Sequence, residues 1–316
     1  MAKSTTTTKA KTKTTKKKTP AKAAVKSAKS TSTKSTKKPV TKAAVKSPTT
    51  AKAAKVSKPA STRLSFLKRP QVIAAGIYGL LAVAAGMLMN NDSVQFLLGH
   101  LTKDELASSA GTVLAPAATS VAEFEYRWLL VGLLVTAAVI ALLRGTRYAK
   151  QETEGLKSHV QALRWVEFGV TGALAFQLAA LLNGMQDLMA LKISCISIVA
   201  AAFFGWMFER ENAATGKPSK ALYYASAAAV VVPVLALVGT MYGTYVYGME
   251  RSPWYAYAAA AVVSVWLLVT VRSIWTNFLR RNSSHNYVVV DRNYNRLSML
   301  SKVLLAAVLI TGLYAQ

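Results

Sequence analysis

Seven long apolar segments follow one another from residue 70 to the end of this chain, and they restrict the fold more than any other feature. Each is long enough as a helix to cross the roughly 30 Å hydrocarbon core of a membrane. They are rich in Ala, Leu and Val and lack the alternation of a membrane β-strand. Since backbone hydrogen bonds must be satisfied within the membrane, we predict that these segments are helices. We therefore predict an all-α membrane protein, a seven-transmembrane helix bundle, with spans at 70–89, 128–146, 160–182, 187–208, 221–242, 255–275 and 295–315.

Two local features refine this prediction. Pro233 lies within the fifth span, where it lacks an N–H and leaves one carbonyl free, so we expect a kink there and a neighbouring helix that satisfies the freed carbonyl. The long first loop, 90–126, contains Val113-Leu114 and Val121–Tyr126, which we predict as short strands with a hairpin as one arrangement.

The first part of the chain has a different composition. Residues 1–69 hold 21 of the 39 Lys and Arg residues and none of the 13 Asp and Glu residues. Such a segment has too little apolar surface to offset its ordering entropy. We predict a disordered basic tail over 1–69 and a rhodopsin-like seven-helix domain over 70–316. Three roles of the tail stay open: attraction to anionic lipid, binding of nucleic acid with steep salt dependence, and orientation of the chain without a specific partner.

The charges of the loops predict the orientation of the bundle. Lys and Arg gather in or beside the second, fourth and sixth loops, and the positive-inside rule assigns such loops to the cytoplasm. We therefore expect a cytoplasmic N-terminus and an external C-terminus. The basic residues counted there are Arg144, Arg147, Lys150, Lys157, Arg164, Arg210, Lys217, Lys220, Arg280, Arg281, Arg292 and Arg296, against Lys103, Arg127 and Arg251 on the opposite side.

One ionisable pair lies within the apolar segments. Lys302 occupies the middle of the last span, where a lysine costs several kcal/mol and marks a functional site by default. Glu167 is the only carboxylate well inside another span, and helical rise puts the two within about one turn in depth. A buried neutral amine can form a Schiff base with an aldehyde, and the protonated imine then needs an anion. Ser298, one turn before Lys302, can hydrogen-bond to either partner. The same pair is also consistent with a plain ion pair between two helices.

Four short motifs bear on this choice. The stretches Arg164-Trp-Val-Glu-Phe168, Phe204-Gly-Trp-Met-Phe-Glu209 and Ser298-Met-Leu-Ser-Lys302, together with Pro233, resemble the heliorhodopsins over roughly residues 70–316. The resemblance implies all-trans retinal bound to Lys302, Glu167 as its counterion, and the inverted topology that the loop charges also predict.

The resemblance also suggests residues of a retinal pocket and two departures from the family. Val234 and Val269 align roughly with family pocket positions, and we add Trp266 and Met299 to the expected pocket. Phe168 stands where many members have Tyr, and Tyr78 stands about where a histidine of the first span is expected. Since the three histidines lie in or near loops, we expect proton movements after illumination to differ from those of better-known members.

The sequence thus predicts a light-sensing retinal protein, a photoreceptor that signals rather than pumps ions. We predict signalling rather than pumping because the interior of the bundle is poor in acids beyond Glu167 and Asp187. A light-activated proton transporter of the viral heliorhodopsin type is one alternative, and a non-photoactive membrane tether with a nucleic-acid-binding tail is another. We find no metal-ligand cluster, phosphate-binding glycine loop or nucleophile triad and expect no enzyme activity. Expected partners are membrane lipid and a soluble signalling protein that the sequence does not identify, and a homodimer is a further assembly to consider.

Overall fold

The computed structural model of the protein describes residues 61–90, 92–103, 114–248, 252–280 and 284–314. All of them belong to one of the two units into which the chain divides, Lys58–Gln316. The predicted tail falls outside the described residues up to residue 60. From Ser61 onward the chain is already helical, so the first helix begins before the boundary that we placed at residue 70.

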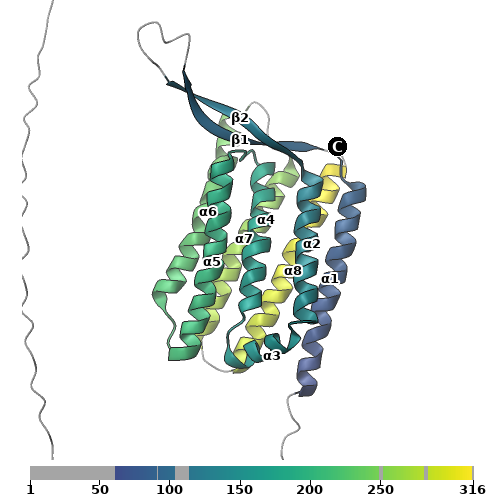
Figure 1. The fold of residues 1–316 in the computed structure, drawn as a ribbon, viewed down its shortest axis with the longest axis vertical. Helices are drawn as coiled ribbons and strands as arrows, with labels where there is room; N and C mark the ends of the chain where they lie inside the picture. Colours follow the sequence, from purple (N-terminus) through teal and green to yellow (C-terminus); the bar gives the residue numbers. More distant parts are fainter. Residues whose placement is uncertain (1–60, 91, 104–113, 249–251, 281–283, 315–316) are drawn as a thin grey trace, which may run out of the picture. The chain divides into compact units, whose positions relative to one another are not determined.

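Eight helices make up this unit among the described residues, and seven of them are long and apolar enough to cross a membrane (Figure 1). The predicted seven-helix bundle is therefore confirmed. The remaining helix, α3, is short and polar and caps one end of the bundle. The helices are α1 (Ser61–Leu88), α2 (Tyr126–Gly145), α3 (Ala149–Ser158), α4 (Ala162–Leu182), α5 (Leu188–Thr215), α6 (Lys220–Tyr247), α7 (Trp254–Arg280) and α8 (Ser284–Tyr314).

Besides α1, the helices α5 and α8 extend well beyond their predicted spans. We ended the fourth span at residue 208, whereas α5 continues to Thr215, and we began the seventh at residue 295, whereas α8 begins at Ser284. Both extensions are rich in polar residues, which lower the hydropathy on which the prediction depends. They are nevertheless helical because one face of each still packs on the bundle, as the buried Tyr287, Val290 and Tyr294 of α8 do.

A β-hairpin covers the end of the bundle opposite α3 (Figure 1). Strand β1 (Ser93–Lys103) pairs antiparallel with β2 (Leu114–Glu125), and a bulge shifts the register between Phe96 and Leu97. The Leu97 N–H donates to the Gln186 carbonyl at 2.9 Å, which ties the hairpin to the α4–α5 loop. Our two predicted strands fall in one strand, β2, which includes Leu114 and residues 121–125, so the hairpin that we considered between them was wrong. We missed its true partner β1 because Phe96-Leu97-Leu98 interrupts the alternation that marks a half-buried strand.

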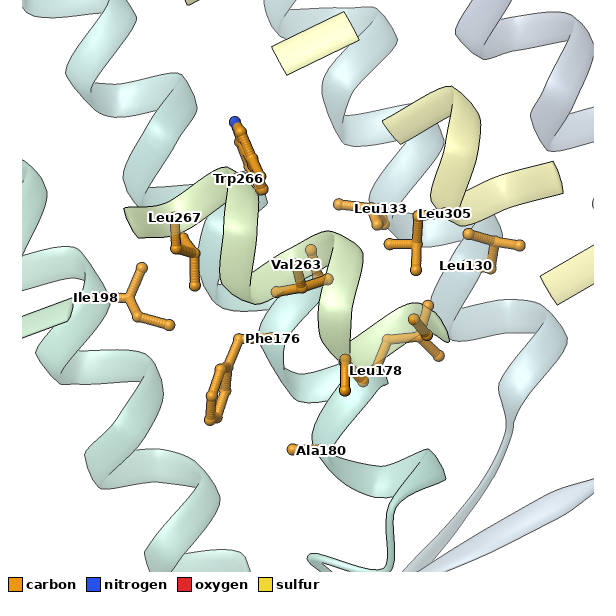
Figure 2. Packing of buried hydrophobic residues seen from close by; sticks show 14 of the residues in the cluster. Leu130, Leu133, Phe176, Leu178, Ala180, Ile198, Val263, Trp266, Leu267 and Leu305 are labelled. Carbon is orange, nitrogen blue, oxygen red and sulfur yellow. The ribbon is translucent and has the colours of Figure 1, made fainter. Parts of the chain in front are cut away.

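The core of the bundle forms around α4, the most buried of the seven spans. It packs on α2, α5 and α7, while α8 packs on α7 and α1. Small residues permit the closest approaches: a Cβ on Gly205 of α5 would lie 2.1 Å from the Trp165 ring of α4. Figure 2 shows the apolar side chains that fill the space between the helices, with Phe176 and Leu178 of α4 near Val263 of α7.

The carbonyl that Pro233 leaves free is satisfied by a neighbouring helix, as the sequence predicts. The helix α6 runs through this residue, and the carbonyl four residues earlier, that of Ala229, has no Pro N–H to bind. The Ser197 hydroxyl of α5 donates to the Ala229 oxygen at 2.8 Å. A neighbouring helix thus supplies the missing donor, and α6 stays continuous.

Candidate functional site

Lys302 and Glu167 meet in the interior of the bundle, as their predicted depths require. The Lys302 Nζ donates to Glu167 Oε1 at 2.9 Å and to the Ser298 Oγ at 2.5 Å. Ser298 also donates to Glu167 Oε1 at 2.9 Å, so three polar side chains form a closed triangle. Lys302 is 1% exposed and Glu167 4% exposed. In such surroundings a carboxylate and an amine have few other partners, and their mutual attraction is strong.

Aromatic side chains surround the amine. The Lys302 Nζ lies 5.0 Å from the Trp266 ring centroid and 5.6 Å from the Tyr78 ring centroid. Tyr78 is buried, and it is the residue that stands about where the family resemblance leads us to expect a histidine. Phe168 packs edge-on against Trp266, with 6.0 Å between ring centroids. The amine therefore lies among aromatic rings in a space from which side chains exclude water.

The four expected pocket residues do not share one environment. Trp266 touches the amine, while Val234 is buried and Met299 packs on the core. Val269, in contrast, is 40% exposed on α7. We therefore do not place Val269 with the other three.

Sequence reasoning missed Arg144, which shares Glu167 with Lys302. We counted this residue among the loop charges, but it lies in the last turn of α2 and is 1% exposed. Its Nη1 donates to Glu167 Oε2 and, at 3.2 Å, to Asn295 Oδ1. Its Nε donates at 2.7 Å to Glu152 of α3. One guanidinium thus links the buried carboxylate to the helix that caps the bundle.

A second buried ionic cluster surrounds Arg164. Its guanidinium donates to Glu209 of α5 and, at 3.2 Å, to Asp291 of α8. Tyr287 accepts from Arg164 and donates to Glu209, each at 3.1 Å. Asn295 donates to Asp291 at 3.0 Å and so joins this cluster to Arg144. Our view of an interior poor in acids beyond Glu167 and Asp187 was therefore wrong, because Glu209 and Asp291 are buried too.

Helical phase is the signal that would have found these residues. Counting back from Lys302 in steps of three or four gives Ser298, Tyr294, Asp291 and Tyr287, all of them buried. Such a row follows one face of a helix. Applied to α2, the same count from Ala137 and Ala141 reaches Arg144.

Residues 67–313 match the heliorhodopsin family. The chain belongs to that family. No curated protein matches the chain. The family implies a retinal chromophore, and the site of this heliorhodopsin has the groups to hold one: a buried amine with an adjacent carboxylate, enclosed by rings. The ring of Trp266 lies 5.0 Å from the amine, and its buried Nε1 has no hydrogen-bond partner among the described residues. The same holds for the buried Thr270 Oγ1, one turn further along α7.

The buried charges of this heliorhodopsin are confined to one part of the bundle. All that are described lie at the level of the amine or between it and α3: Arg144, Arg164, Glu167, Glu209, Asp291 and Lys302. We call this part the α3 half. The part between Lys302 and the hairpin, which we call the hairpin half, is filled instead by apolar side chains. Examples are Leu309 and the leucines labelled in Figure 2, Leu130, Leu133, Leu178 and Leu305.

Proposed function

We propose that this heliorhodopsin is a light sensor that carries all-trans retinal on Lys302 as a protonated Schiff base, with Glu167 as the counterion. The observation that carries the proposal is the closed triangle of Lys302, Glu167 and Ser298. An isolated buried lysine would be costly, whereas one beside a single carboxylate is ready to hold an imine that bears a positive charge.

The covalent linkage needs only the amine and the aldehyde. Lys302 would hold retinal through its side-chain nitrogen: the ammonium group and the aldehyde would combine with loss of one water, and the nitrogen would keep the third ammonium proton together with the positive charge. Bound retinal supplies absorption of visible light and isomerisation about a double bond. Glu167 holds the compensating negative charge, and Ser298 orients the carboxylate by its 2.9 Å hydrogen bond. The rings of Trp266 and Tyr78 supply apolar walls next to the nitrogen.

We favour signalling over transport because the buried charges are one-sided. A transported proton needs polar groups on both sides of the imine, and in the described residues the hairpin half buries no Asp, Glu, Lys or Arg. From the loop charges we propose further that the α3 end faces the cytoplasm. A light-induced change at Glu167 would then alter the structure at the cytoplasmic end of the bundle, where a soluble partner can bind.

Proton transport is the second candidate, and the ionic chain from Lys302 to Glu152 favours it. The Glu152 side chain is 13% exposed, so the chain reaches the edge of the bundle. Voltage-clamped cells that express the protein distinguish the two candidates. Sensing predicts no sustained photocurrent, whereas a sustained current that changes sign with membrane potential would establish transport.

The chromophore itself is tested by a spectrum. The full-length protein, purified after addition of all-trans retinal, should show a visible absorption band, and Lys302→Ala should lack it. A wild-type protein without such a band, although folded, would contradict the proposal. A membrane tether without a chromophore predicts that deletion of residues 1–60 abolishes function while Lys302→Ala is harmless, and the sensor predicts the opposite ranking.

A further inference from the structure

We infer that Arg144 is a positioning residue of the chromophore site and that it couples the charge at Glu167 to the placement of α3. The inference rests on the proposed function, because it assigns the path by which the light-induced change leaves the site. It concerns a residue and a helix outside the Lys302, Glu167 and Ser298 triangle.

Glu167 divides its two carboxylate oxygens between two sets of partners. Oε1 accepts from Lys302 and Ser298, while Oε2 accepts from Arg144. Arg144 has a fully buried guanidinium, so little solvent screens its charge. It therefore draws part of the negative charge of Glu167 away from the nitrogen of Lys302, and it fixes the plane of the carboxylate.

Arg144 has carboxylate partners on two sides, Glu167 and Glu152. Its Nε donates to Glu152 Oε1 at 2.7 Å and its Nη2 to Glu152 Oε2 at 3.3 Å, a two-point contact that fixes direction as well as distance. When the positive charge near Glu167 weakens or moves, Glu167 attracts Arg144 more strongly. When Glu167 is neutralised, Arg144 keeps only Glu152 as a charged partner. In both cases the attraction of Arg144 to Glu167 changes relative to its attraction to Glu152 on α3.

The helix α3 has few other attachments among the described residues. The Gln161 side chain donates to the Glu152 carbonyl at 2.9 Å, and the Gln161 N–H donates to Glu209 at 3.1 Å. Ala149 and Leu156 are the two buried residues of this helix. A short polar helix held by so little apolar burial belongs to the less stable parts of a fold, which open locally at small cost. It is thus the element best suited to respond to a change at Arg144.

The chain offers two matched controls. Arg147 is exposed and lies one turn from Arg144, and Glu154 is exposed on α3 beside Glu152. Each has the charge of the residue it controls for but makes no hydrogen bond or ion pair with the described residues of the site: Arg147 lies in the turn between α2 and α3, and Glu154 lies on α3 itself. A spin label at Lys157→Cys, in a Cys195→Ser background, reports the mobility of α3, and a label at Lys217→Cys reports the neighbouring α5–α6 loop.

The experiment compares these variants with and without retinal. With retinal bound, Arg144→Gln should shift the dark absorption band to shorter wavelength, because the whole charge of Glu167 then faces the imine. Arg144→Lys keeps a positive charge, so its band should lie between those of the wild type and Arg144→Gln. Arg147→Gln and Glu154→Gln should leave the band in place. Illumination should change the spectrum of the label at position 157 but not at 217, and Arg144→Gln or Glu152→Gln should abolish the change.

The outcomes separate this inference from the proposed function. A wild-type protein that forms the visible band while the label at position 157 ignores light, or while Arg144→Gln and Arg147→Gln have the same band, overturns the inference and leaves the chromophore proposal intact. If the wild type forms no band, the retinal-free protein still decides the coupling. There Glu167→Gln should change the signal at position 157, and should no longer do so in an Arg144→Gln background. Glu152→Gln gives the same information if Arg144→Gln does not fold.

Discussion

The α3 half and the hairpin half of the bundle differ in what their buried polar groups bind. In the α3 half, buried side chains carry charge and bind one another, as Arg164 does with Glu209 and Asp291. In the hairpin half, polar side chains bind backbone carbonyls, as Asn183 does with Ala179 and Ala256 at 2.8 and 2.9 Å. Charges that depend on one another respond jointly when one of them changes, whereas capped carbonyls only fix helices in place. The first arrangement suits a route for a signal, and the second suits a rigid frame.

The largest effect should follow from neutralising the charge next to Lys302. Glu167→Gln removes the anion that stabilises a protonated imine and leaves Arg144 nearby, so at neutral pH most of the visible band should move to the near ultraviolet or become dependent on chloride. Absorption spectra over a range of pH and chloride concentration measure this.

Asp187→Asn is the matched control for that substitution. Asp187 lies at the hairpin end, where its Oδ1 accepts from the Ala190 N–H at 2.6 Å as the N-cap of α5. Its replacement should leave the colour almost unchanged. A normal spectrum in Glu167→Gln would show that Glu167 is not the counterion.

Next in size is the loss of the second cluster in the α3 half. Arg164→Met leaves the carboxylates of Glu209 and Asp291 without their cation in a buried place, a change that costs about 3–5 kcal/mol. The thermal midpoint of colour loss in detergent should drop strongly. Arg210→Met, at an exposed position beside Trp206, should leave the midpoint nearly unchanged. Equal midpoints in the two variants would show that the cluster does not stabilise the bundle.

Substitutions in the hairpin half should affect stability without affecting colour. Leu309→Ala removes a fully buried side chain and should cost roughly 2–5 kcal/mol, depending on how far the site collapses. The absorption maximum should stay, because no buried charge of the described chain lies beside this residue. Thermal stability and spectrum, measured on one sample, check both statements. A large spectral shift in Leu309→Ala would show that the hairpin half also affects the chromophore site and is not only a rigid frame.

The sequence predicts the two halves unequally. Hydropathy identifies the seven spans, and a charge inside an apolar segment identifies Lys302 and Glu167, because both signals are local. Arg144, Glu209 and Asp291 lie near the ends of spans, where a solvated charge and a buried, paired one look alike in the sequence. Which of these is true depends on the partners that other helices bring, and those partners are distant in the chain. The hairpin was predicted only in part, since Ala-rich β2 and the uneven β1 have weak strand patterns.

The smallest effect concerns a single capped carbonyl of the frame. Ser197→Ala removes the donor that replaces the missing N–H of Pro233 at the Ala229 oxygen, and such interhelical hydrogen bonds contribute about 0.6 kcal/mol on average in membrane bundles. If the serine acts through that carbonyl alone, its effect depends on the proline. In a Pro233→Ala background the N–H of residue 233 returns and can bind Ala229, so Ser197→Ala should then cost close to nothing. Thermal midpoints of the wild type, both single variants and the double variant give this coupling. Additive effects would mean that Ser197 stabilises the helix pair by packing, and that the carbonyl freed by Pro233 is satisfied in another way.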